Sequence, residues 1–244
     1  MKRLILAFSL VAAVVAAPAT AADRPARIFL VSCTTGLDIA DRSVVYDARM
    51  RRVAGTRRMQ MRFALQWRQP GAKRWAGIKA PGLGTWVSSN PGVKSYTFTK
   101  RIENLAAPAS YRVVVRFRWL DARGHTLHSD TIVARPCRQP DLRPNLVPTR
   151  VYTERIGDPA MRRYVVVVRN KGETAAGAFD VAFGTLPPSH VVDLGPGVST
   201  LVSFEAPRCD APASLTATVD AGALIDEADE DDNSLSVPCP VGPV

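Results

Sequence analysis

The chain has 244 residues, with 32 Lys and Arg against 22 Asp and Glu, four Cys and three His. Its 46% hydrophobic and 22% charged content is ordinary for a folded protein, which excludes wholesale disorder. The few His and Cys leave little material for a metalloenzyme or a redox enzyme. The net charge of +10 suggests nucleic acid binding, but this sum hides two parts of opposite sign.

Residues 1–22 have the pattern of a cleaved secretory signal peptide. Lys2 and Arg3 precede an apolar run that ends at Pro18, and the small residues Ala19–Ala21 form a cleavage pattern. The run is shorter than the ~20 residues that span a bilayer, and no later segment reaches that length. We therefore expect a secreted or cell-surface protein without a transmembrane segment.

Strand patterns dominate residues 23–139. Over 59–67 and 111–119, apolar residues occupy every second position and Arg or Gln fills several of the intervening ones. Shorter strands are expected near 27–33, 43–53, 73–79, 95–102 and 127–135. About seven strands in such a length predict a β-sandwich.

Prolines punctuate the middle of the chain. Pro136, Pro140, Pro144 and Pro148 recur every four residues, which predicts a stiff, extended spacer rather than a sheet interior. We therefore expect two tandem domains after the signal peptide, at 23–139 and 140–244.

The two expected domains differ in charge. Residues 23–139 hold 22 Lys and Arg against 7 Asp and Glu, a balance of +15. Residues 140–244 hold 8 against 15, a balance of −7. Opposite charges of this size favour docking of the domains, within one chain or head to tail between chains.

Four cysteines in an exported chain predict two disulfides, because the compartment is oxidising. Three pairings are open to Cys33, Cys137, Cys209 and Cys239. The division into two domains favours Cys33–Cys137 and Cys209–Cys239.

Two segments of the first domain resemble fibronectin type III domains. The segment SYTFTKRIENLAAPASY (95–111) is similar to the E–F corner of that family, and FALQWRQPGAKRW (63–75) to its C–C′ hairpin. The resemblance implies an Ig-like sandwich in which the Tyr111 hydroxyl bonds to backbone upstream. It also implies that the strands at 59–67 and 111–119 are neighbours.

Six arginines would then share one outer sheet face: Arg58, Arg62, Arg68, Arg112, Arg116 and Arg118. Guanidinium groups form paired hydrogen bonds with phosphate, sulfate and carboxylate groups. This face is therefore a candidate site for an anionic glycan, a teichoic-type polymer or an acidic protein. The alternative is a solvated face in an Arg-rich chain, since 26 of the 32 basic residues are Arg. Export disfavours specific nucleic acid binding.

The second domain contains three motifs, which follow one another along the chain: YVVVVRNKG (164–172), LGPGVSTLVSF (194–204) and IDEADEDDNS (225–234). Their order resembles CARDB, the cell adhesion related domain found in bacteria, over about 141–239. The resemblance implies an Ig-like sandwich in exported bacterial proteins and an adhesion role with no assigned residues. Strands at 215–220 and 234–238 are expected to form a terminal hairpin whose open end Cys209–Cys239 would close.

An acidic turn offers oxygen ligands for Ca²⁺ from Asp226, Glu227, Asp229, Asp231 and Asn233. Its opening matches an EF-hand, but Ser234 replaces the required Gly and Pro240 stands where the bidentate Glu should be. The alternative is a solvated turn whose side chains cap backbone N–H groups. No other cofactor or metal is expected.

Catalytic motifs are missing from the sequence, which contains no G-x-S-x-G, no P-loop and no H-E-x-x-H. His190 has no recognisable acid or nucleophile partner. We therefore expect a non-enzymatic binding or adhesion protein. The alternatives are a structural spacer or self-associating envelope accessory module, and an undetected hydrolase.

Overall fold

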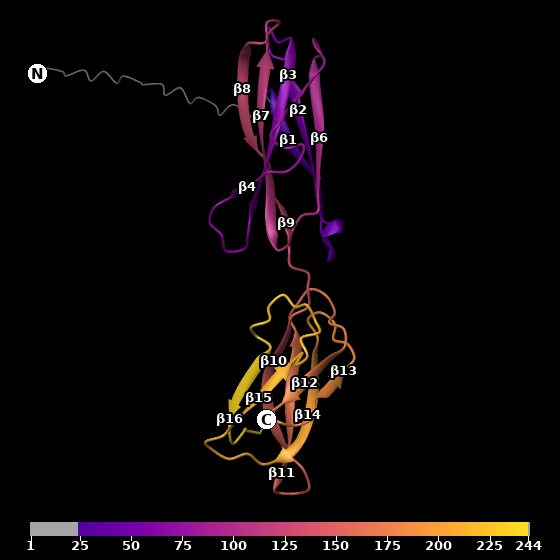
Figure 1. Ribbon diagram of the computed structural model, residues 1–244, viewed down its shortest axis with the longest axis vertical. Helices are drawn as coiled ribbons and strands as arrows, with labels where there is room; N and C mark the ends of the chain where they lie inside the picture. Colours follow the sequence, from indigo (N-terminus) through magenta and orange to yellow (C-terminus); the bar gives the residue numbers. More distant parts are fainter. Residues whose placement is uncertain (1–23, 244) are drawn as a thin grey trace, which may run out of the picture.

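The computed structural model describes residues 24–243, so the expected signal peptide lies outside the described residues. Two β-sandwiches follow one another along the long axis (Figure 1). The all-β fold predicted from the alternation is confirmed, since the helical structure within 24–243 is one short 3-10 turn, η2 (Ile39–Asp41). No helix in this range is long and apolar enough to cross a membrane.

The N-terminal sandwich packs two antiparallel sheets against each other. One sheet has the order β1-β2-β6; the other has the order β4-β3-β7-β8, with β5 also paired to β3 and β9 to β7. The strands are β1 (Ala26–Thr34), β2 (Ser43–Arg51), β3 (Arg58–Arg68), β4 (Ala76–Ile78), β5 (Trp86–Ser88), β6 (Ser95–Glu103), β7 (Ala109–Leu120), β8 (Thr126–Val133) and β9 (Cys137–Gln139).

Period-two alternation builds the core of this sandwich. Every second side chain of β3 and β7 is buried, including Met61, Phe63, Phe117 and Trp119. Tyr111 is also buried, and its hydroxyl donates to the Ala106 carbonyl at 2.8 Å, as the resemblance to fibronectin type III domains implies.

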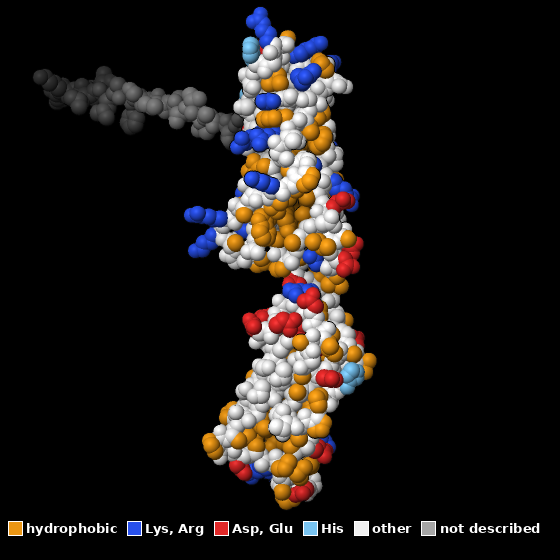
Figure 2. Space-filling view, in the orientation of Figure 1, with side chains coloured by type: hydrophobic (Ala, Val, Ile, Leu, Met, Phe, Trp, Pro, Cys, Tyr) orange, Lys and Arg blue, Asp and Glu red, His pale blue; other side chains and the backbone are white. Residues whose placement is uncertain are grey.

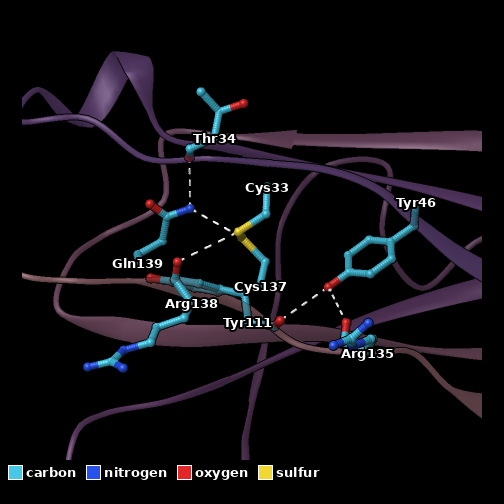
Figure 3. The surroundings of a disulfide bond; sticks show 8 residues. All are labelled: Cys33, Thr34, Tyr46, Tyr111, Arg135, Cys137, Arg138 and Gln139. Carbon is cyan, nitrogen blue, oxygen red and sulfur yellow. Dashed lines mark hydrogen bonds between the residues drawn. A yellow bond between two sulfur atoms is a disulfide. The ribbon is translucent and has the colours of Figure 1, made fainter.

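A disulfide ties the first strand of this sandwich to its last. Cys33 in β1 is bonded to Cys137 in β9, 104 residues later. The buried Gln139 amide lies over the bond and donates to the Thr34 carbonyl at 3.0 Å (Figure 3). The disulfide and the amide together fasten the chain just before it leaves the sandwich.

The linker between β9 and β10 is shorter than the stiff spacer that the prolines predict. Pro148 lies inside a strand, where it is tolerated because β10 is a sheet edge and its register shifts between Pro148 and Arg150. Residues 141–145 are fastened to the C-terminal sandwich, since Thr174 Oγ1 donates to Leu142 O at 2.7 Å and Ala228 N to Pro144 O at 2.9 Å. Pro148 is thus kept out of a sheet interior, as the proline pattern predicts, but the strands β9 and β10 take up part of the expected spacer.

The C-terminal sandwich also has two antiparallel sheets, ordered β10-β11-β14 and β13-β12-β15-β16. The predicted terminal hairpin is the pair β15–β16, and the Cys209–Cys239 disulfide lies at its open end. The strands are β10 (Leu146–Arg155), β11 (Met161–Asn170), β12 (Phe179–Phe183), β13 (Ser189–Val191), β14 (Ser199–Pro207), β15 (Ser214–Val219) and β16 (Ser234–Pro238).

Asn170 organises the end of this sandwich that faces the linker. It is fully buried, and its side-chain oxygen accepts from the N–H groups of Asn145 and Gly172 at 3.1 and 2.9 Å. Its amide nitrogen donates to the carbonyls of Thr174 and Leu194. A Cβ on Gly172 would lie 2.4 Å from the Arg143 carbonyl oxygen, so only glycine lets the linker approach this closely.

Candidate anion-binding face

The arginine face is formed by neighbouring strands in register. β3 and β7 pair along their whole length, and Arg62 lies directly opposite Arg116. Arg118 and Arg112 of β7 lie opposite Gln60 and Gln66 of β3. Arg58 and Arg68 occupy the two ends of β3. All six arginines that the sequence singled out therefore lie along the outward side of these two strands, in rows that only the uncharged pair Ala64 and Val114 interrupts.

Two tryptophans that the sequence analysis did not assign to this face hold some of its arginines. Trp86 from β5 has the Arg118 guanidinium 4.0 Å from its ring centroid. Trp75, from the connection between β3 and β4, has Arg112 at 4.1 Å and Arg68 at 4.8 Å. Stacking of this kind keeps the guanidinium planes in place while their N–H groups stay available.

Glutamines from β3 orient the same arginines. Arg118 Nε donates to Gln60 Oε1, and Arg112 Nε donates to Gln66 Oε1 at 2.9 Å. Gln60 is itself held, because its amide nitrogen donates to Ser88 Oγ at 2.7 Å. Arg112 and Arg118 are thus held in place by both a tryptophan and a glutamine.

Countercharges are missing from the face, within the part of the chain that the structure describes. None of the ion pairs in residues 24–243 includes any of the six arginines. On the opposite sheet, by contrast, Arg49 pairs with Asp47 and Arg101 with Glu103. Like charges directly across a strand pair are unfavourable, so Arg62 and Arg116 cost the fold stability.

Charge is divided along the molecule as the composition indicates. Figure 2 shows Lys and Arg gathered on the N-terminal sandwich. It shows Asp and Glu gathered at the linker end of the C-terminal sandwich, here called the joint between the two sandwiches. A hollow of about 800 Å³ lies at this joint, with Arg68 and Arg138 on one side and Asp141 and Glu173 on the other.

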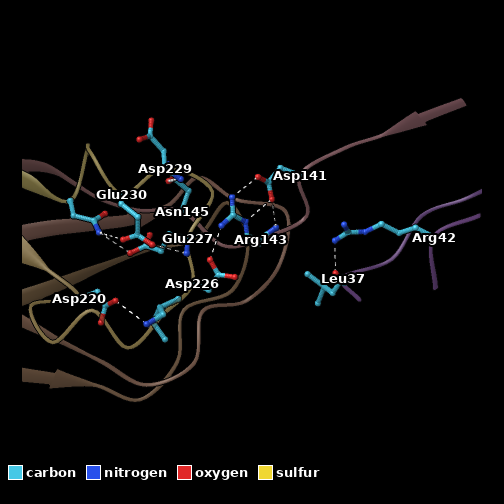
Figure 4. Close-up of polar contacts among 12 residues, drawn as sticks. Leu37, Arg42, Asp141, Arg143, Asn145, Asp220, Asp226, Glu227, Asp229 and Glu230 are labelled. Atoms are coloured by element: carbon cyan, nitrogen blue, oxygen red, sulfur yellow. Dashed lines mark hydrogen bonds and ion pairs between the residues drawn. The ribbon is translucent and has the colours of Figure 1, made fainter. Parts of the chain in front are cut away.

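At the joint, the acidic turn braces the linker. Arg143 donates to Asp141 at 2.9 Å and to Asp226 at 2.6 Å (Figure 4). This guanidinium lowers the pKa of the Asp141 carboxyl below its usual range. Asp226 is thus directed toward a cation of the linker rather than toward the other carboxylates of the turn.

Glu227 is the buried member of the acidic turn. Only 1% of its surface is exposed; one carboxylate oxygen accepts from Leu146 N–H and the other from Asn233 Nδ2 at 3.0 Å (Figure 4). The pKa of Glu227 is raised to about 7, mainly by burial and in smaller part by the nearby charges of Glu230 and Asp220, against the hydrogen bonds from Leu146 and Asn233, which lower it.

The calcium hypothesis stays a prediction that these contacts do not support. Asp229 accepts from the backbone N–H of Asp231 at 3.1 Å, which is the capping role of the alternative interpretation. Within residues 24–243, no group of three or more His, Cys, Asp or Glu side chains is placed to hold a metal ion. Asp226 instead contacts Arg143, and Glu227 and Asn233 are hydrogen-bonded to each other.

His190 has an acid partner, contrary to the expectation from sequence. β12 and β13 place it opposite Asp180, and His190 Nδ1 lies 2.9 Å from Asp180 Oδ1. The sequence analysis missed this pair because Asp180 is ten residues upstream on another strand. Both side chains are exposed, and no hydrogen bond to a Ser, Thr or Cys side chain extends the pair within the described residues.

The fold and these sites define a tandem Ig-like β-sandwich protein. The CARDB family model matches residues 139–237, which confirms the resemblance of the C-terminal sandwich to that family. CARDB is a cell adhesion related domain of bacteria, and its match is confined to this part of the chain. No curated protein matches the chain.

Solved structures match the chain only loosely. Red sea bream transglutaminase is 11% identical with a TM-score of 0.30, and the match covers 88% of this chain but only 31% of the enzyme. The class 5 fimbriae chaperone CfaA is 11% identical with a TM-score of 0.28 and covers 87% of this chain and 98% of its own. E. coli alpha-2-macroglobulin is 10% identical with a TM-score of 0.30, over 87% of this chain and 16% of its own. Similarity at this level assigns no function.

Proposed function

We propose that this chain is a secreted or surface-associated, non-enzymatic adhesion protein whose N-terminal sandwich binds anionic polymers of the cell surface. The proposal divides the mature chain into a fibronectin type III-like domain at 23–139 and a CARDB-like domain at 140–244. An adhesion-type domain and two disulfides suit a protein that works outside the cytoplasm.

The observation that supports this proposal is the uncompensated pair Arg62 and Arg116. The two guanidinium groups lie opposite each other on an exposed sheet face, with no carboxylate partner among the described residues. On the same face, Trp75 contacts the guanidinium group of Arg112 and Trp86 contacts that of Arg118. An array of this kind gains most when a polyanion supplies the missing charge.

The test compares two variants that lose equal charge. In the first, Arg62→Gln and Arg116→Gln remove the central pair; in the second, Arg49→Gln and Arg101→Gln remove two cations from the opposite sheet of the same sandwich. Binding to immobilised polyanions is measured at physiological salt. We expect the first variant to lose about tenfold or more in affinity, and the second to stay near wild type.

A specific observation also favours a spacer role, because Arg143, Asp141 and Asp226 brace the linker against the C-terminal sandwich. If the wild-type chain retains no polyanion at physiological salt, or if the two variants weaken equally, the arginine face is not a binding site. The spacer role would then stand in its place.

A further inference from the structure

A hollow of about 230 Å³ lies in the middle of the arginine face. It lies between the row that contains Arg62 and Arg116 and the next row that contains Gln66 and Arg112. Its lining consists of Arg62, Ala64, Gln66, Gly84, Val114 and Arg116. The intervening row, Ala64 opposite Val114, carries no charge, so the series of cations along the two strands is interrupted here.

The charged side chains that line this hollow offer only hydrogen-bond donors. The guanidinium groups of Arg62 and Arg116 contain only donors, and neither has a partner among the described residues. Gln66 has one acceptor, but its Oε1 already accepts from Arg112 Nε, which leaves the amide N–H groups. A ligand of this hollow must therefore supply acceptors, as a carboxylate, sulfate or phosphate does.

The bottom of the hollow is apolar, whereas the polar side chains of Arg62, Arg116 and Gln66 form its sides. The side chains of Ala64 and Val114 are apolar and lie between two rows of cations. Gly84 adopts a φ of +78°, and its N–H donates to Phe63 O at 2.8 Å, which fixes the loop beside Arg62. The positive φ favours glycine at this position, and a Cβ here would lie 4.0 Å from the Arg62 guanidinium, beside the hollow.

We propose that this hollow binds one acidic sugar residue of a polysaccharide. The anionic group lies between Arg62 and Arg116, a sugar hydroxyl accepts from the Gln66 amide, and the weakly polar ring face rests on Ala64 and Val114. A bare phosphate polymer would use only the cations and leave the apolar floor uncovered. This inference rests on the proposed function of the arginine face and names the ligand class for it.

The spacing of charges along the face agrees with this ligand class. Alternate residues of a strand are about 6.6 Å apart, so the cationic rows on either side of the uncharged row lie about 13 Å apart. A polymer in which anionic groups are separated by sugar rings can place a charge at each of these rows. The ring between them then covers Ala64 and Val114.

The experiment uses the full mature chain and calorimetric titration with three probes matched in total charge: a uronic acid oligosaccharide, a sulfated oligosaccharide and a polyphosphate. We expect at least one oligosaccharide to bind about tenfold or more tightly than polyphosphate. The oligosaccharide that binds identifies the anionic group. Polyphosphate that binds as tightly as both sugars would overturn the inference.

Two variants fill the hollow without removing any arginine. Ala64→Phe occupies the floor, and Ala64→Glu places a carboxylate between the cations; Ala64 is exposed, so both substitutions are compatible with folding. Thr97→Phe, at an exposed position on the opposite sheet, is the matched control. We expect both Ala64 variants to lose oligosaccharide affinity by about tenfold and the control to keep it.

The outcomes separate this inference from the proposed function. If the Arg62 and Arg116 substitutions abolish binding while both folded Ala64 variants bind the oligosaccharide like wild type, the face binds polyanions but the sugar site does not exist. If the arginine substitutions change nothing, the proposed function itself fails. Circular dichroism and thermal melting establish that each variant is folded before titration.

Discussion

Raising the pH from about 5 to about 8 should destabilise the C-terminal sandwich through Glu227. This carboxyl is 1% exposed, and its pKa is raised from an ordinary value of 4.5 to about 7, mainly by burial. Since the folded state holds the proton more tightly than the unfolded chain does, folding is favoured when Glu227 is protonated. That stabilisation is fully present below pH 4.5 and is lost as the pH rises through about 7.

The magnitude follows from the two pKa values. Between pH 4.5 and 7 the unfolded chain has released the proton while the folded chain keeps it. At about 1.4 kcal/mol for each pH unit, this interval corresponds to a loss of about 3 kcal/mol in the free energy of unfolding. Against a total of about 5–15 kcal/mol for a folded domain, such a loss is readily measured.

The assay is urea unfolding of the full chain across this pH range, for wild type and for Glu227→Gln. Gln cannot ionise, so the variant should lack this part of the pH dependence. The variant should also be less stable at low pH, because the amide nitrogen of Gln would face either Leu146 N–H or Asn233 Nδ2, which are both donors. Hydrogen exchange of the Leu146 amide gives a local readout.

Parallel pH profiles for wild type and variant would refute the reasoning. A Glu227 carboxyl that titrates near its ordinary pKa, measured by carbon-detected NMR, would refute it as well. In either case the carboxylate is solvated or better paired than the contacts with Leu146 and Asn233 indicate.

Three further predictions concern stability. Asn170→Ala should cost about 3 kcal/mol, because four backbone groups that are buried or partly buried lose their partner; urea unfolding measures this, and a loss below about 1 kcal/mol would contradict it. Replacing Cys209 and Cys239 by Ser should cost about 3–4 kcal/mol in the chain-entropy account, since the bond closes a 30-residue separation; an unchanged melting temperature would count against this. Arg62→Thr should stabilise the N-terminal sandwich by about 0.2–1 kcal/mol at low salt through relief of repulsion from Arg116, and a loss of stability would show that the two cations do not repel each other.

The sequence by itself determined the class of fold, and its division into two domains favoured the cysteine pairing that the structure shows. Alternation with period two is a local property, so the strands near Met61 and Phe117 could be assigned from neighbouring residues alone. The order of the motifs around Asn170 and after it carried the resemblance to CARDB, which the family model over residues 139–237 supports. The outward position of Arg62 and Arg116 followed from the same alternation.

Only the tertiary structure decided which side chains meet across strands. Trp75 contacts the Arg112 guanidinium, and Gln66 Oε1 accepts a hydrogen bond from the same arginine. Asp180 lies within hydrogen-bond distance of His190. The register of the strands and the paths of the loops set these contacts. Such contacts depend on the packing of the whole sheet, which no local pattern encodes. The donors that line the arginine face could be listed from the sequence, but the hollow between them exists only in the assembled sheet.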